Sequence, residues 1–409
     1  MTRMLAALVF AMTLLGTAHG ARAQADCQFI DQWVGTPVRR VGVAATPTRT
    51  LIWADGVARE VDAAGAEVPV ELVPGADQVL GDAGGFWRIR TDLASTVVVT
   101  RPQSTGDVTV TLGTSVWTMN SAIGAVGDGV LAVAWARPLA QYGTEHDVHL
   151  AVLRADATVA FTAEVPARAG AYGAWPVVSG GVVWLVWRED PYLRIVGQRY
   201  TLDGTPLDTE PREFARDINT VDLVPIAGGV RMYAYTPSGT IDVYQLAADG
   251  AATARGPFAG PYRAVRIGTG DAVVHLGYPT DGADLFPTAG EIPVVRESSA
   301  GDLTPVATLV GADVAAAALG GDVLIASAVD TAAATTGAST LEVRRLPAAA
   351  ALGPPQPIVA NPFAIGPVEY CDDPYDGCSA GGGRAGTLAV VVLALAVAGR
   401  GRRRARVAP

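Results

Sequence analysis

A short apolar strand led by a glycine recurs about every fifty residues, and it limits what this chain can fold into. Its clearest copy is Gly181-Val-Val-Trp-Leu-Val-Trp187, which is apolar on both faces. A strand with one solvated face would alternate apolar and polar residues, so these strands must be covered on both sides. Copies begin at or near residues 51, 85, 129, 181, 229, 270 and 321. In three of them an aromatic residue (Trp135, Trp187 or Tyr235) falls six positions after the glycine.

A second element, an alternating strand that ends in a tight turn, lies between these copies. Two copies end in the turns Asp203-Gly204 and Asp249-Gly250, which are strong hairpin signals. The copies start near Val57, Asp107, Asp147, Ile195, Ile241, Ile292 and Thr340. The spacing is that of propeller blades, roughly 40–50 residues each. We therefore predict an all-β fold over residues 26–370, a β-propeller of six or seven blades with less than about a tenth helix. The alternative is two consecutive β-sandwich domains.

These repeats resemble the degenerate propeller repeats of large bacterial surface proteins. The resemblance covers residues 50–355 and is carried by the glycine-strand-aromatic pattern and the Asp-Gly turn. Independently of the resemblance, inner blade strands that pack between neighbouring blades need the two-faced apolarity of the glycine-led strands. The Trp and Tyr side chains of these strands are therefore expected to be core residues.

Residues 1–25 have the three parts of a secretory signal. Arg3 provides the positive charge, Leu5 to Leu15 is an apolar run, and Ala23-Gln24-Ala25 fits a cleavage site. The run is shorter than the ~20 residues of a membrane span. We expect export and a mature N-terminus at Asp26.

The C-terminal end changes composition after Pro367. Residues 371–385 form an acidic and glycine-rich linker, and residues 386–409 combine the apolar stretch Thr387 to Ala398 with a cluster of arginines. An apolar run followed by positive charge is a stop-transfer arrangement, which predicts a short apolar helix.

The tail from Cys378 resembles the myxobacterial C-terminal sorting signal (MYXO-CTERM). Cys378-Ser-Ala-Gly-Gly-Gly, then Leu388 to Val397, then the terminal arginines match that signal in order, over residues 378–409. The resemblance implies recognition or modification at Cys378 by a sorting protease. It also implies retention at the cell surface, on the outer membrane of a Gram-negative bacterium. Whether the tail is removed or stays as a permanent membrane anchor is left open.

The charged residues exclude several functions. The chain has 30 arginines and no lysine, so it has neither a lysine-containing phosphate loop nor a Schiff-base lysine. Between Asp26 and Asp376, 40 acidic side chains against 22 arginines leave a charge of −18. Such a surface repels nucleic acid, and no nucleic-acid partner is predicted.

The three cysteines flank the predicted propeller. A propeller brings its chain ends together, so Cys27 and Cys371 are a candidate disulfide in an oxidising compartment. The rival pairing joins Cys371 to Cys378 and leaves Cys27 free.

Histidines offer the main candidates for metal ligation. Glu145-His146-Asp147-Val148-His149 is the only histidine cluster, but on a strand His146 and His149 point to opposite faces. No metal site is predicted without a third ligand, and no cofactor is predicted. His275 lies within an apolar strand and is expected to be a satisfied core histidine.

No motif identifies a catalytic residue. We therefore expect a non-catalytic binding protein or a structural envelope protein, with a carbohydrate or a protein as the possible ligand. The alternative is a secreted hydrolase or lyase, carbohydrate-active, with carboxylates in the propeller channel. Acidic and histidine side chains that converge at the channel mouth would favour the enzyme.

Overall fold

The computed structural model describes most of residues 41–364, and all of its strands belong to one compact unit, Gly35–Gly366. The gaps are residues 55–56, 63–65, 69–77, 92–95, 104–105, 115–121, 140–144, 170, 190–192, 262–263, 278–289, 312, 320, 331–337, 348–355 and 358–362. The predicted signal, all three cysteines and the sorting tail lie outside the described residues.

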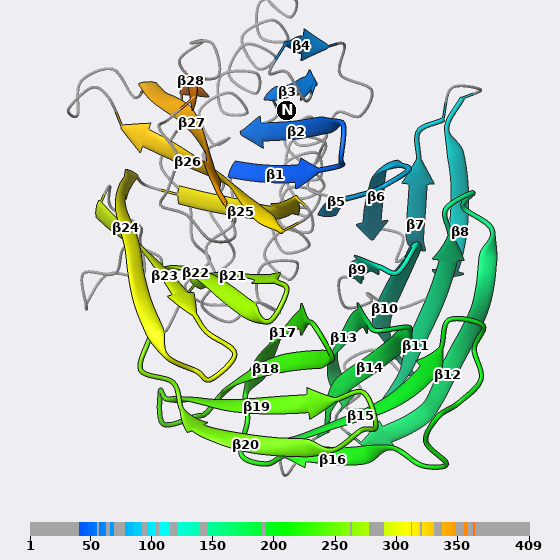
Figure 1. Cartoon of the computed structure of the whole chain (residues 1–409). Coiled ribbons are helices and arrows are strands. Elements are labelled where there is room, and N and C mark those ends of the chain that lie inside the picture. Colours follow the sequence, from blue (N-terminus) through cyan, green and yellow to red (C-terminus); the bar gives the residue numbers. More distant parts are fainter. Residues whose placement is uncertain are drawn as a thin grey trace, which may run out of the picture. The chain divides into compact units, whose positions relative to one another are not determined.

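Seven antiparallel sheets, each built from consecutive strands, are arranged in a ring (Figure 1). Blade 1 consists of β1 (Val41–Ala45), β2 (Arg49–Ala54), β3 (Val57–Asp62) and β4 (Glu67–Val68). Blade 2 consists of β5 (Gln78–Asp82), β6 (Gly85–Thr91), β7 (Thr96–Arg101) and β8 (Val108–Thr114). Blade 3 consists of β9 (Ile123–Gly127), β10 (Val130–Pro138), β11 (Glu145–Arg154) and β12 (Val159–Ala169). Blade 4 consists of β13 (Ala171–Ser179), β14 (Val182–Glu189), β15 (Arg194–Thr201) and β16 (Arg212–Ala215).

The remaining three blades follow the same order. Blade 5 consists of β17 (Thr220–Ile226), β18 (Gly229–Tyr235), β19 (Ile241–Ala247) and β20 (Ala252–Pro257). Blade 6 consists of β21 (Ala264–Thr269), β22 (Ala272–Gly277), β23 (Gly290–Glu297) and β24 (Leu303–Gly311). Blade 7 consists of β25 (Asp313–Leu319), β26 (Asp322–Asp330), β27 (Ala338–Leu346) and β28 (Gln356–Pro357), and β29 (Phe363–Ala364) also pairs with β27.

The first strand of each blade contacts the first strand of the next, and β25 contacts β1 to close the ring. The fold is therefore a seven-bladed β-propeller. This confirms the predicted propeller and fixes the blade number, whereas the alternative of two sandwiches is wrong. The described residues form strands and turns without any helix, so they include no helix that could span a membrane.

The two sequence elements correspond to defined strands of the blades. The six glycine-led copies and the apolar copy near residue 51 are the second strands of the seven blades, from β2 to β26. The alternating copies are third strands in six blades. The exception begins near Asp107 and is β8, the fourth strand of blade 2.

Seven hydrophobic clusters fill the seven interfaces between blades. The strand β14 shows why its sequence is apolar on both faces. Val183, Leu185 and Trp187 pack against blade 3, whereas Val182, Trp184 and Val186 pack against blade 5. Successive side chains of a strand point to opposite faces, so a strand between two blades buries both sets.

Two of the three repeated aromatic residues are equivalent, and the third is not. In blades 3 and 4 the second strand pairs from the residue after the glycine (Gly127 with Val130, Ser179 with Val182). In blade 5 pairing starts at Gly229 itself. This one-residue shift reverses the face of every side chain. Trp135 and Trp187 therefore face the preceding blade, while Tyr235 faces the following one.

Glycines let the inner strands approach one another closely. A Cβ atom at Gly268 would overlap the Pro225 carbonyl oxygen of blade 5, and one at Gly81 would overlap the Ala45 carbonyl of blade 1. These positions require glycine because the neighbouring backbone occupies the space of a side chain.

The ring has two ends that differ in their connections. At one end of the ring, the second strands end, the third strands begin and each blade connects to the next. We call this end the upper rim. A single residue joins β12 to β13 and β24 to β25, so successive blades keep the same orientation. The opposite end, where first strands lead into second strands, is the lower rim.

Candidate functional site

The predicted histidine cluster lies on β11, the third strand of blade 3, at the upper rim. Ala151 and Leu153 of this strand pack toward blade 2, and Val148 and Leu150 pack toward blade 4. By the same alternation His149 faces blade 2 and His146 faces blade 4. The two histidines therefore lie on opposite faces, as predicted, and do not form a joint site.

The structure brings a different set of residues to His149. Asp147 lies two residues earlier on the same face, and Glu164 of β12 is the cross-strand partner of His149. One ligand atom from each of these three side chains lies within 4.8 Å of the others. We call Asp147, His149 and Glu164 the Asp147 cluster. Glu164 is the third ligand that the sequence analysis lacked, and it could not be identified without the register.

Two residues of β10 fix the positions of this cluster. Arg137 Nη2 lies 2.7 Å from Asp147 Oδ2 and 3.9 Å from Glu164 Oε1. The Trp135 ring stacks on the His149 ring with centroids 5.2 Å apart and planes inclined by 9°. The imidazole is therefore held flat against an indole, with its Nδ1 3.7 Å from Glu164 Oε2.

The His149 side chain is nearly enclosed, with 9% of the residue exposed. Burial lowers the pKa of His149, and the positive charge of Arg137 lowers it further, against the opposing effect of Glu164 and Asp147. The imidazole is thus neutral at neutral pH. Its Nε2 is buried and has no hydrogen-bond partner in the described part of the chain.

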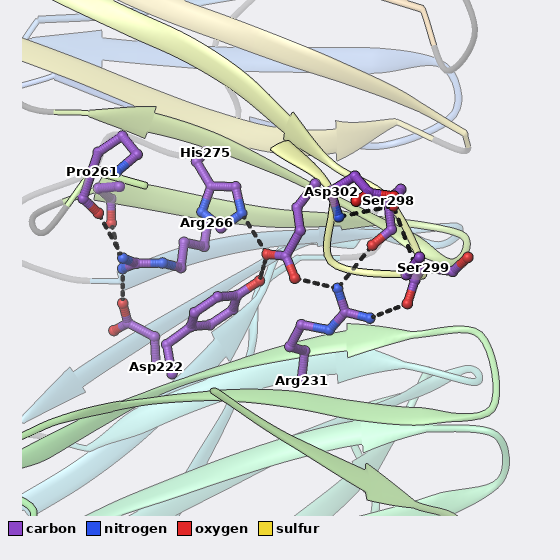
Figure 2. A network of polar contacts seen from close by, with 12 residues as sticks. Asp222, Arg231, Pro261, Arg266, His275, Ser298, Ser299 and Asp302 are labelled. Carbon is purple, nitrogen blue, oxygen red and sulfur yellow. Dashed lines mark hydrogen bonds and ion pairs between the residues drawn. The ribbon is translucent and has the colours of Figure 1, made fainter. Parts of the chain in front are cut away.

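A second group of polar residues is buried between blades 5 and 6 (Figure 2). Glu297, at the end of β23, is its centre. Arg231 Nη1 donates to Glu297 Oε1 at 2.5 Å, while the Tyr233 hydroxyl (2.5 Å) and His275 Nε2 (2.9 Å) donate to Oε2. All four residues are at most 2% exposed. We call them the Glu297 network.

Arginine and tyrosine side chains extend this network to the upper rim. The Arg266 guanidinium lies 4.7 Å from the centre of the Tyr233 ring and donates to the Tyr235 hydroxyl and to Asp222. Tyr235 in turn donates to Asp222 at 2.7 Å. Aromatic and charged groups therefore run through the interface from the lower rim, where Arg231 bonds the Ser298 carbonyl, to Asp222.

The protonation states in the Glu297 network follow from burial and hydrogen bonding. Burial by itself would raise the pKa of Glu297, but hydrogen bonds from His275 and Tyr233 and the charge of Arg231 lower it overall. Burial lowers the pKa of His275, although its bond to Glu297 opposes that effect. Burial and the charge of Glu297 raise the pKa of Tyr233. Glu297 is thus an anion that accepts from a neutral histidine, a tyrosine and an arginine cation.

The prediction that His275 is a satisfied core histidine is confirmed in part. The residue is fully buried and its Nε2 is hydrogen-bonded, but its Nδ1 has no hydrogen-bond partner in the described part of the chain. Its partner Glu297 was not foreseen. The two residues lie on neighbouring strands 22 positions apart, and nothing in the local sequence links them.

The described acid–histidine groups lie away from the innermost strands. The Asp147 cluster is on third and fourth strands, and the His275–Glu297 pair is on a second and a third strand. Among the first strands whose side chains are described, the carboxylates are Asp82 and Asp222. Asp82 accepts two hydrogen bonds from Arg101, and Asp222 pairs with Arg266.

Three interfaces repeat one arrangement at the upper rim: an aromatic ring beside an arginine–carboxylate pair. At the interface of blades 3 and 4, Trp187 Nε1 donates to Glu189 at 3.1 Å and Arg194 donates to the same carboxylate at 2.7 Å. The other two groups are those described above. Their members are Trp135, Arg137 and Asp147 between blades 2 and 3, and Tyr235, Arg266 and Asp222 between blades 5 and 6. We call these groups the rim triplets.

The predicted sorting residue Cys378 and the candidate disulfide Cys27–Cys371 lie outside the described residues. The structure therefore adds nothing to these predictions.

No protein-family model matches the sequence, and no curated protein matches it either. Among solved structures, the chain is similar to a puromycin hydrolase, with 16% identity, a TM-score of 0.52 and coverage of 85% of this chain and 56% of that one. It is also similar to the acylaminoacyl peptidase of Pyrococcus horikoshii, with 8% identity, a TM-score of 0.48 and coverage of 75% and 51%. A third similar structure is the lectin of Aleuria aurantia in complex with Fucα1-6GlcNAc, with 11% identity, a TM-score of 0.40 and coverage of 67% and 97%.

This chain spans little more than half of the two hydrolase chains that it matches. At such low identity the likeness concerns the propeller fold alone, because one fold carries many unrelated functions.

Proposed function

We propose that this chain is an exported protein held at the cell surface, whose propeller binds a carbohydrate or protein ligand without catalysing a reaction. The observation that supports this proposal is the threefold occurrence of the rim triplets. Each triplet places an arginine, which donates hydrogen bonds, and a carboxylate, which accepts them, beside an aromatic side chain. All three triplets lie at the upper rim.

One polar member of each triplet is accessible to a ligand. The side chains of Arg137, Arg194 and Asp222 are each 35% exposed, whereas the ion-pair partner of each within its triplet is at most 9% exposed. Guanidinium and carboxylate groups can bond sugar hydroxyls or peptide groups with defined geometry. A rigid propeller presents such groups without a large ordering cost.

Binding can be tested on a glycan array with the purified protein and two variants. Arg194→Gln removes an upper-rim cation, and we expect it to weaken binding of a captured oligosaccharide at least about tenfold. Arg345→Gln is the control, because Arg345 also pairs with a carboxylate, Asp322, but lies at the lower rim, where its side chain is 61% exposed. Its binding should equal that of the wild type. Equal losses in both variants, or no glycan bound by any, would contradict the proposal for carbohydrate ligands.

A secreted hydrolase or lyase is the second candidate. Asp222 favours it, since this half-exposed carboxylate lies on an innermost strand beside Tyr235 and Arg266. Turnover of glycoside or peptide substrates that Asp222→Asn abolishes while the fold persists would support the enzyme over the binding protein.

Surface retention rests on the sorting signal that begins at Cys378. We propose that the tail is processed there and that the mature protein lacks the terminal arginines. Intact mass spectrometry of surface-extracted protein measures this directly. Mature protein that still carries Arg406 to Pro409 would mean that the tail is a permanent anchor.

A further inference from the structure

The Asp147 cluster combines an imidazole and two carboxylates on one face of blade 3, at the upper rim. We propose that Asp147, His149 and Glu164 bind a divalent transition-metal ion of the zinc type. The cluster shares Asp147 with one rim triplet, but the proposal does not require the rim triplets to bind a carbohydrate.

The backbone places the three side chains together. His149 and Glu164 are direct cross-strand partners, and Asp147 precedes His149 by two residues, so all three project from the same face. Zinc–ligand distances of about 2.0–2.2 Å put ligand atoms of a tetrahedral site about 3.3–3.6 Å apart. The ligand atoms of Asp147, His149 and Glu164 lie up to 4.8 Å apart, so these distances need to shorten by little more than 1 Å to bind the ion. The Glu164 side chain is 53% exposed and can supply that movement by a change of rotamer.

An independent observation points to a ligand at this position. His149 is buried to about nine-tenths and makes no hydrogen bond to the described residues. Its Nδ1 faces the Glu164 carboxylate at 3.7 Å, which is too long for a hydrogen bond. The buried atom without a partner is Nε2, whereas Nδ1 is the atom that faces Glu164. A metal ion bound by Nδ1 and the two carboxylates would give that nitrogen the partner that buried polar groups normally have.

The donor set selects the kind of ion. Calcium takes six to eight oxygen ligands and magnesium retains several waters, whereas imidazole with carboxylates suits zinc and its neighbours. Three protein ligands leave a position open for water or an external ligand. Arg137 Nη2 lies 2.7 Å from Asp147 Oδ2, so its guanidinium neutralises one of the two carboxylate charges of the cluster and competes with a metal ion for Asp147. The remaining negative charge attracts a cation, and Trp135 holds the imidazole plane.

Isothermal titration of the purified full-length chain with zinc chloride tests the site. The thiols of Cys27, Cys371 and Cys378 should first be blocked with iodoacetamide, because thiolates bind zinc themselves. We expect one ion per chain. His149→Phe keeps a ring to stack on Trp135, and Glu164→Gln keeps the side-chain shape. Each should weaken binding at least about tenfold.

Two further variants sharpen the experiment. Arg137→Gln removes a competing cation and should tighten zinc binding several-fold. Glu213→Gln is the matched control, since Glu213 is a partly exposed, arginine-paired carboxylate at the upper rim of blade 4, and its variant should bind as the wild type does. Circular dichroism verifies the fold of each variant, and Glu164→Gln changes an exposed side chain that folding does not require. No saturable binding by the wild type, or binding unchanged in both Glu164→Gln and a folded His149→Phe, would overturn the proposal.

Discussion

The Glu297 network and the Asp147 cluster with its neighbours Arg137 and Trp135 contain the same kinds of side chain: a histidine, one or two carboxylates, an arginine and an aromatic ring. In the Glu297 network the carboxylate accepts three hydrogen bonds, the histidine donates one, and all four side chains are sealed between two blades. In the Asp147 cluster the histidine makes no hydrogen bond to the described residues, and Glu164 reaches solvent. The residue types alone do not distinguish the two.

The difference lies in the carboxylates, since each histidine has one buried ring nitrogen without a partner in the described residues. Both Glu297 oxygens accept hydrogen bonds inside the interface, and removing this carboxylate leaves a buried arginine uncompensated. The Glu164 carboxylate is 53% exposed, and a cluster with such an open side can accept a ligand. We therefore assign the Glu297 network to the stability of the interface between blades 5 and 6, and the Asp147 cluster to binding.

The largest expected effect comes from Glu297→Gln. The substitution leaves Arg231 as a buried cation without its counter-ion, at a cost of about 3–5 kcal/mol in the free energy of unfolding. Urea denaturation followed by intrinsic fluorescence measures the change. Glu164→Gln is the control in the open cluster and should change the free energy of unfolding by less than about 0.5 kcal/mol. Similar losses in both variants would refute the distinction between the two regions.

A smaller effect is expected in the pH dependence of stability. The pKa values of His149 and His275 are both lowered by folding, so the unfolded chain takes up protons first as the pH falls. Stability should be complete above the unfolded pKa of about 6.5 and should fall below it, by at most about 1.4 kcal/mol per pH unit for each histidine. The His149→Phe variant lacks one of the two titrating histidines, so its free energy of unfolding should fall less steeply than that of the wild type between about pH 7 and pH 5.

Two controls separate the effect of His149 from that of the carboxylates. The lowered pKa of Glu297 stabilises the fold at pH values above the usual carboxyl range, and this stabilisation is lost only at still lower pH, below the range in which the histidines titrate. Glu213→Gln should keep the wild-type dependence between pH 7 and pH 5. An identical dependence in the wild type and His149→Phe would show that His149 titrates alike in the folded and unfolded chain.

Much of the fold could be predicted from local patterns. The glycine-led strands are all second strands, because a strand buried on both faces needs an uninterrupted apolar sequence. Register could not be predicted so well. Tyr235 matches Trp135 and Trp187 in its distance from the glycine, yet pairing begins one residue earlier in blade 5 and turns it toward the opposite blade. The copy near Asp107 likewise became a fourth strand, since alternation is the same in any half-exposed strand.

The candidate site was predicted only in part. Asp147 and His149 were visible as a local run, and the opposite orientations of His146 and His149 followed from strand periodicity. Glu164 and Arg137 were not identified, because they come from the two neighbouring strands. Their positions depend on loops and a β-bulge that set which residues lie opposite.

The sequence by itself determined an all-β repeat protein without lysine chemistry, because periodicity, turn residues and composition act over a few neighbouring positions. The tertiary structure decided the count of seven blades, since closure depends on how each inner strand packs on the next. It also decided which polar residues became neighbours. Strand register brings His275 beside Glu297 and His149 beside Glu164. The burial around each pair then shifts the pKa of its histidine and decides which polar atoms can reach solvent or a ligand. Those are long-range properties that no local window of the sequence contains.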